Sequence, residues 1–261
     1  MADNSYFRYS ADRIPVSIIL ALSGIDFLMY FFVSNFYVLI VYFLIMLLPK
    51  WYICSWNHHH QHTPTFSKIP LNRILEFFYA LHTGVTTNLW LLHHVFGHHK
   101  NFLNQEKDES RWQRKSGKKM GIIEYTFVVS ITAYYRGYIV GQKYPKHQKN
   151  YIMYSSFTFF VVFCLVCLKP MSGILLFLLP MILGLVGTSL VTYDHHSGLS
   201  IDNEFEASRN DLSKFHNIIS GNLGYHTAHH HKQGVHWSKL PELHEKIKHK
   251  IPKDLIKNSA T

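Results

Sequence analysis

Three clusters of histidine along the chain have the spacing of metal ligands. The clusters are separated by long apolar segments, and neutral imidazole is a good ligand for iron, zinc or copper. Eight imidazoles are more than one ion can use, so the set predicts a pair of metal ions. The histidines are His58 and His62 in the first box, His94, His98 and His99 in the second box, and His226, His229 and His230 in the third box.

The spacing within each box suits a helix, because residues at i, i+3 and i+4 share one helical face. Each box is therefore expected to present two or three imidazoles to one point. A ninth ligand is expected from His195 or His196, which follow the last apolar segment. Asp194 is expected to orient one of these imidazoles from outside the ligand set.

Other histidines adjoin the boxes but fall outside their spacing. His60 and His231 are each next to or near a predicted ligand, and we expect them to support ligands without binding metal. His59 and His93 are expected to be supporting or exposed residues. The alternative for the whole set is a solvated surface patch that binds metal adventitiously. Three boxes near apolar segments make that alternative the weaker one.

Four segments are long and apolar enough to cross a bilayer, which takes about 20 residues. Only Ser34 and Asn35 separate the first two segments, and Lys169 and Pro170 separate the last two. These short connections predict an all-α integral membrane fold with four transmembrane helices in two hairpins. The predicted spans cover residues 15–33, 36–53, 151–168 and 171–191 of a single domain over 1–261.

The distribution of positive charge predicts the sidedness of this fold. The chain carries 26 Lys and Arg residues, and only Lys169 falls in a hairpin tip. The positive-inside rule therefore places both termini, the middle region 57–150 and the C-terminal region 194–261 in the cytoplasm. All three boxes lie in these regions, so the metal site is expected on the cytoplasmic face.

The regions outside the spans also carry helical patterns. Residues 71–99 are expected to be helical, 121–141 to form an interfacial helix, and 241–251 a short amphipathic helix. Residues 105–119 form a charged loop. Inside the first span, Asp26 is expected to be protonated and hydrogen-bonded to Ser23 or Tyr30, because an ionised carboxylate is unfavourable there.

The boxes and hairpins together resemble the integral-membrane fatty acid desaturase and hydroxylase superfamily. That superfamily has boxes of the form H-x(3,4)-H, H-x(2,3)-HH and H-x(2,3)-HH, and the resemblance runs from about Pro15 to Leu243. It implies two irons that activate O2, held by the eight box histidines. Gly97 and the stretch 193–199 are similar to the alkane hydroxylase branch, in which His196 rather than His195 occupies the matching position.

The resemblance implies an O2-dependent di-iron oxidoreductase that desaturates a fatty acyl chain, with hydroxylation of an alkyl or acyl chain as the alternative. This reaction needs an electron donor. The donor is expected to be a separate ferredoxin, rubredoxin or small cytochrome, since the chain has no G-x-G-x-x-G or haem motif. Long-chain lipid is the expected substrate and membrane lipid the surroundings, with no nucleic acid. A remoter alternative is a histidine-rich metal-binding protein or transporter, although a transporter should carry ligands inside its spans.

Overall fold

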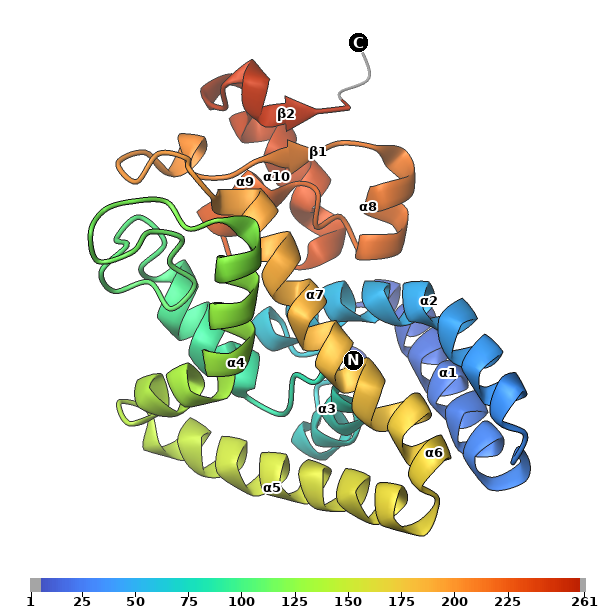
Figure 1. Ribbon diagram of the computed structural model, residues 1–261. Helices are drawn as coiled ribbons and strands as arrows, with labels where there is room; N and C mark the ends of the chain where they lie inside the picture. The colour runs from blue at the N-terminus through green and yellow to red at the C-terminus, as the bar shows by residue number, and fades with distance from the viewer. Residues whose placement is uncertain (1–5, 259–261) are drawn as a thin grey trace. The chain divides into compact units, whose positions relative to one another are not determined.

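The structure is a computed structural model that describes residues 6–258 (Figure 1). Contacts divide the chain into two compact units. The described part of unit 1 covers 6–60, Pro64–Asn88 and Lys149–Leu185, and that of unit 2 covers Gln61–Thr63, Leu89–Gln148 and 186–258. The predicted single domain over 1–261 includes residues 1–5 and 259–261, which lie outside the described residues.

Long apolar helices dominate the chain, as the sequence predicts. Four of them are long and apolar enough to cross a membrane, and they cover Ser10–Phe32, Phe36–His62, Pro145–Leu168 and Pro170–His196. The first comprises the short turn η1 (Ser10–Asp12) and α1 (Arg13–Phe32), the second is α2 (Phe36–His62), and the third is α5 (Pro145–Leu168). The fourth comprises α6 (Pro170–Gly173), the π-helix η3 (Ile174–Leu178) and α7 (Leu179–His196). Figure 1 labels the α-helices of this set.

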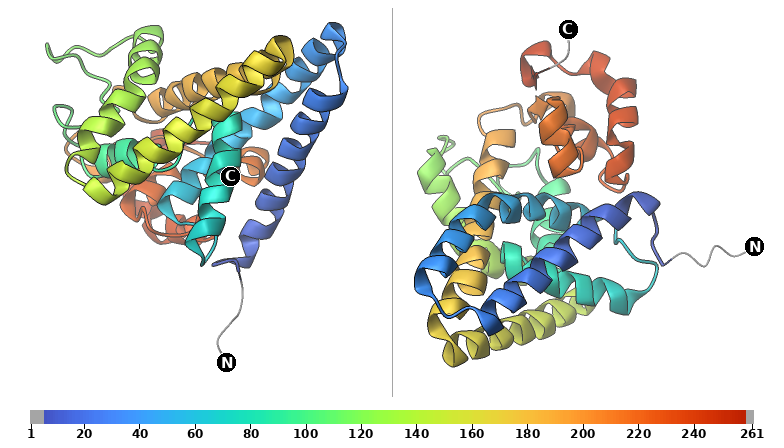
Figure 2. Two further views of the ribbon diagram at one scale, coloured as in Figure 1. Left: turned by 90° about the horizontal axis from the view of Figure 1, so that it is seen from below. Right: turned by 90° about the vertical axis from the view of Figure 1, so that its right-hand side faces the viewer.

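Polar connections end these helices where the sequence predicts. Both views of Figure 2 show the short turn between α1 and α2. Here the Asn35 side chain accepts a hydrogen bond from the Val38 N–H and so begins α2. Pro170 stands in the first turn of α6, where its missing N–H is not needed. The second helix runs nine residues beyond the predicted span, from 53 to 62, and so carries the first box on a continuous helix.

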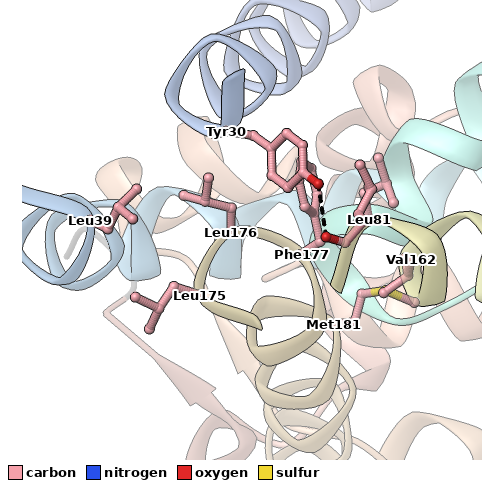
Figure 3. Packing of buried hydrophobic residues seen from close by; sticks show 9 residues of the cluster. Tyr30, Leu39, Leu81, Val162, Leu175, Leu176, Phe177 and Met181 are labelled. Carbon is pink, nitrogen blue, oxygen red and sulfur yellow. Dashed lines mark hydrogen bonds between the residues drawn. The ribbon is translucent and has the colours of Figure 1, made fainter. Parts of the chain in front are cut away.

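The core of unit 1 is built from the inner faces of these helices (Figure 3). Tyr30, Leu81, Leu176 and Phe177 are almost fully buried there, and the Tyr30 hydroxyl donates to the Leu165 carbonyl at 2.8 Å. The outer faces are apolar and exposed, as Phe32 at 80 % exposure shows. Apolar residues on both faces of a helix are typical of helices that meet lipid.

The buried carboxylate of α1 has partners that the sequence analysis did not predict. Asp26 lies 2.7 Å from Lys50 Nζ and accepts a hydrogen bond from the Tyr42 hydroxyl at 2.7 Å. The predicted partners are wrong, because Ser23 instead hydrogen-bonds to His82 at 2.8 Å and Tyr30 to a backbone carbonyl. The reason is that Lys50 stands 24 residues from Asp26 in the sequence and reaches it only through the packing of the folded chain.

This ion pair gives a prediction about stability. Asp26→Leu would leave the Lys50 ammonium buried without its anion, and breaking a buried pair on one side typically destabilises by about 3–5 kcal/mol. Adding Lys50→Met should recover most of that loss, because the double variant has no buried charge left. Thermal unfolding of the purified variants in detergent measures both effects. A double variant that is no more stable than Asp26→Leu would contradict the prediction.

The helical structure predicted over 71–99 is confirmed over 71–83 and again over 91–99, but a turn interrupts it after Thr83. Helix α3 covers Ile69–Thr83 and ends at Gly84, whose φ of 67° favours glycine. A Cβ at Gly84 would also collide with the Met181 carbonyl oxygen. The chain then becomes helical again as the π-helix η2 (Leu91–His99), which belongs to unit 2.

Unit 2 packs the remaining elements around the histidine-bearing segments. Helix α4 (Ile122–Gly141) matches the predicted helix over 121–141 and lies against η2. This contact is close, since a Cβ at Gly137 would lie 2.8 Å from a Leu89 methyl group. The interfacial position of α4 stays a prediction.

The C-terminal part of unit 2 is made of short elements. Helix α9 (His226–His231) packs on α10 (Leu240–Ile247) through Ala228, Leu243 and Ile247. The amphipathic helix predicted over 241–251 is thus confirmed up to Ile247 and ends in a 3-10 turn. The other elements are η4 (Glu204–Glu206), β1 (Asn210–Asp211) parallel to β2 (Ile256–Lys257), α8 (Lys214–Ser220), η5 (Trp237–Lys239), η6 (Lys248–Lys250) and η7 (Lys253–Leu255).

Candidate metal centre

The first box lies in the last two turns of α2. His58 and His62 are one helical turn apart on this helix, as their spacing predicts. His62 is the last residue of α2 and belongs to unit 2, whereas His58 belongs to unit 1. Between them, His60 uses both ring nitrogens elsewhere in unit 1, at 2.9 Å from Thr65 Oγ1 and 3.2 Å from Glu76 Oε1.

The second box lies on the π-helix η2 and not on an α-helix. A π-helix bonds residue i to i+5, so residues five apart come close together. Accordingly, the Nε2 atoms of His94 and His99 are 3.0 Å apart. His98 is directed elsewhere, with its Nδ1 2.8 Å from an Asp108 carboxylate oxygen.

Helix α9 carries the third box at the predicted spacing. His226, His229 and His230 are all buried. The ring of His229 lies 4.5 Å from that of His62, and the ring of His230 lies 4.6 Å from that of His196. The two neighbouring residues His229 and His230 therefore belong to different clusters of imidazoles.

Within unit 2 the imidazoles form two groups whose ligand atoms lie within 4.8 Å of one another. We call them group A and group B. The rings of His99 and His230 stack at 4.0 Å and bring the groups side by side. Group A contains His62, His94, His99 and His229, and group B contains His98, His196 and His230.

Two further imidazoles adjoin group B. His226 Nε2 lies 3.0 Å from His196 Nε2, so His226 extends the group. The ring of His195 stacks on that of His226 at 3.8 Å. Of the two candidates at the end of α7, His196 is the one whose ring nitrogen meets group B.

This grouping corrects one expectation of the sequence analysis. The spacing predicts that each box directs its imidazoles to a single point. Instead, the second box gives His94 and His99 to group A but His98 to group B, and the third box divides in the same way. The physical reason for the second box is the π-helix, whose wider turn separates His98 from its neighbours.

The atoms of these groups fit a metal pair. Among residues 6–258, the buried nitrogens His98 Nε2, His230 Nδ1 and His230 Nε2 have no hydrogen-bond partner. Buried polar atoms are seldom left unsatisfied, and such an exception calls for an explanation such as an ion. Burial also holds the pKa values of His99, His226 and His230 well below the usual range, with neighbouring imidazoles adding to the effect. The rings are therefore neutral, which is the form that binds metal.

The residues expected to support the ligands lie as follows. Asp194 is exposed, with its carboxylate 3.9 Å from Lys257 Nζ. His231 Nδ1 lies 3.2 Å from a carboxylate oxygen of Glu204. The carboxylate that does contact a candidate ligand is Asp108, which the sequence analysis missed because it was one of several acidic residues in a charged loop.

One comparison with known proteins supports this site. A family model described as fatty acid desaturase matches residues 34–258, a stretch that contains all three boxes. No curated protein matches the chain.

Proposed function

The chain belongs to the fatty acid desaturase family, and from that premise we propose that it is an O2-dependent di-iron oxidoreductase that forms a double bond in a fatty acyl chain. One observation carries the proposal: two groups of imidazoles, each with its ligand atoms close together, lie side by side in unit 2. Two adjacent groups of imidazoles can hold two metal ions. A single surface patch of histidines would not hold an ion pair.

We assign the ligands by group. His62, His94, His99 and His229 would hold one iron, with His58 one turn before His62 on the same helix. The second iron would be held by His98, His196, His226 and His230, with His195 as the alternative to His196. When bound, the iron pair supplies the redox chemistry that activates O2 for attack on an unreactive C–H bond.

The surrounding residues would keep this site dry. The Trp90 ring stacks on His94 at 5.5 Å, and the Phe102 ring lies 4.6 Å from that of His230. Both rings fix the orientation of an imidazole and occupy space that water would otherwise fill. Exclusion of water strengthens electrostatic interactions inside a site and prevents side reactions.

The substrate class follows from the membrane setting. Four apolar helices with exposed apolar faces suit a protein that takes a long-chain lipid from the bilayer. A separate electron donor of the ferredoxin, rubredoxin or small cytochrome type is required, and the formal charge of +10 would attract an acidic one. The transporter alternative is weaker, because the charged Asp26 in α1 is already paired with Lys50.

We propose that the four helices cross the membrane as two hairpins. Within unit 1, Lys169 Nζ donates to the carbonyl oxygens of Tyr30 and Phe31 at 3.0 and 2.9 Å. This contact joins the end of α1 to the connection between α5 and α6, so both tips would lie on one side. Both termini and the metal centre would then face the cytoplasm.

Labelling of single cysteines tests this topology. In a background without Cys54, Cys164 and Cys167, Ser34→Cys should react only from outside the cytoplasm. Ser116→Cys, in the exposed middle loop, should react only from the cytoplasm. Reaction of both positions from the same side would rule out the two-hairpin arrangement.

Lipid mass spectrometry of cells with and without the gene tests the reaction itself. Desaturation yields an acyl product lighter by two hydrogen atoms. A product heavier by one oxygen atom would replace the proposal with the hydroxylase alternative. An unchanged lipid profile, in cells where the protein holds iron and a donor is present, would contradict both reactions.

A further inference from the structure

We propose that Asp108 is a positioning residue that fixes the His98 imidazole and thereby determines whether the metal position of group B is filled. The inference rests on the proposed function in one respect, namely that metal ions occupy the two groups. It concerns a residue outside the three boxes.

The contact between Asp108 and His98 is direct and buried. Asp108 Oδ1 lies 2.8 Å from His98 Nδ1, and each side chain is 1 % exposed. The same oxygen accepts a hydrogen bond from the Ser110 N–H at 2.7 Å. The carboxylate is thus held by the backbone and cannot turn away from the ring without losing this bond.

This contact determines which nitrogen of His98 can bind metal. An ionised carboxylate only accepts hydrogen bonds, so the His98 proton must be on Nδ1. The lone pair is then on Nε2, the buried nitrogen that has no hydrogen-bond partner among residues 6–258. A carboxylate that accepts from a ligating imidazole fixes its tautomer and raises its basicity.

Asp108 supplies a negative charge, which the imidazole ligands of group B lack. Imidazole ligands carry no negative charge, so a divalent cation brought among those of group B would be buried without a counter-charge. His196 is oriented in the analogous way, but its Nδ1 donates to the neutral Ala207 carbonyl at 2.8 Å. Asp108 therefore brings a negative charge within one imidazole ring of the group B metal position.

Rigid neighbours position the Asp108 segment. A Cβ at Gly97 would lie 2.6 Å from Glu109 Cγ, so the segment packs directly on the π-helix η2. Arg136 of α4 also donates to the Glu109 carbonyl oxygen. Gly97, which the sequence analysis singled out, thus gives the room that Asp108 needs to reach His98.

The test compares Asp108→Ala with Gln105→Ala in the full-length protein. Gln105 is a matched control, because its Oε1 accepts from the Trp112 and Gln113 N–H groups at 2.8 and 3.1 Å and so organises the same loop. It stands three residues before Asp108, and both of these hydrogen bonds come from backbone groups of the loop. Iron per chain after anaerobic loading and the rate of iron release to a chelator are measured for each variant.

Asp108→Ala should hold about one iron where the unaltered protein holds about two, and the weaker ion should leave about 10–100-fold faster, the range typical of lost ligand support. The iron content and release rate of Asp108→Asn should lie between those of Asp108→Ala and the unaltered protein, since the amide oxygen still accepts a hydrogen bond from the ring but carries no charge. Gln105→Ala should keep both irons.

Two outcomes would overturn the inference. One is an Asp108→Ala protein with normal iron content and release, and the other is equal iron loss in Gln105→Ala, which would assign the effect to the loop as a whole. An unaltered protein that holds two irons but changes no lipid would contradict the proposed function and leave the inference standing.

Discussion

Replacing His94 or His229 with alanine is expected to abolish turnover while leaving the protein normally inserted in the membrane. Both side chains are almost fully buried and belong to group A, where each offers a nitrogen to the same point. Loss of a direct ligand should lower activity by more than the about 10–100-fold typical of residues that only support ligands. Insertion depends on the four apolar helices and should not change. Product formation per milligram of membrane-embedded protein measures the effect.

Two control variants separate ligands from other histidines. His249→Ala should leave activity unchanged, because this residue lies in the turn η6 beyond the boxes. His60→Ala should lower activity by about 10–100-fold without abolishing it, since its ring nitrogens already contact Thr65 and Glu76. If His60→Ala is inactive while His58→Ala turns over, the first-box ligands would instead come from His59, His60 and His62.

The large features of this protein could be predicted from its sequence because each one depends on a long or repeated pattern. Four apolar runs of about 20 residues fix four helices regardless of the details of packing. The box histidines of unit 2 lie in two adjacent groups, and His196 rather than His195 has a ring nitrogen in group B; metal binding by these residues stays a prediction. Several residues contribute to each of these patterns, so misinterpreting one residue does not change the predicted helix or cluster.

The remaining features depend on single residues whose effect is set by their neighbours. Gly84 ends α3 because the Met181 carbonyl leaves no room for a side chain, and nothing near Gly84 in the sequence shows that contact. Lys50 stands 24 residues from Asp26 in the sequence, and only the folded structure brings its ammonium to 2.7 Å from that carboxylate. Asp108 looks like any acidic residue of a charged loop, although its side chain is 1 % exposed and faces His98.

The division of the second box has a different origin. Spacing arguments assume the α-helical period, and the segment 91–99 adopts the wider π-helical turn. Under the α-helical assumption His94 and His98 would share a face, whereas the structure pairs His94 with His99. The same histidines are involved in both descriptions, but they are assigned to different metal positions.

That assignment leads to a prediction about metal content. His229→Ala should empty the position of group A, and His196→Ala should empty that of group B. Each single variant is expected to retain about one iron, and the double variant none, because the two groups use different ligand atoms. All three variants should be inactive, since the proposed reaction needs both ions. Iron analysis after anaerobic loading, with protein concentration from amino-acid analysis, gives the ratios.

The stacked rings of His99 and His230 give a structural reason why a single variant could lose both irons instead of one. These rings belong to different groups and lie 4.0 Å apart, so a disturbed group A could displace a ligand of group B. Loss of both irons from His229→Ala would mean that the pair is held as a unit and that the groups are not separate positions. A single tightly held zinc, with activity intact after iron is removed, would contradict the iron pair altogether. Retention of one iron by each single variant would instead confirm the pairing of His94 with His99 and of His98 with His196.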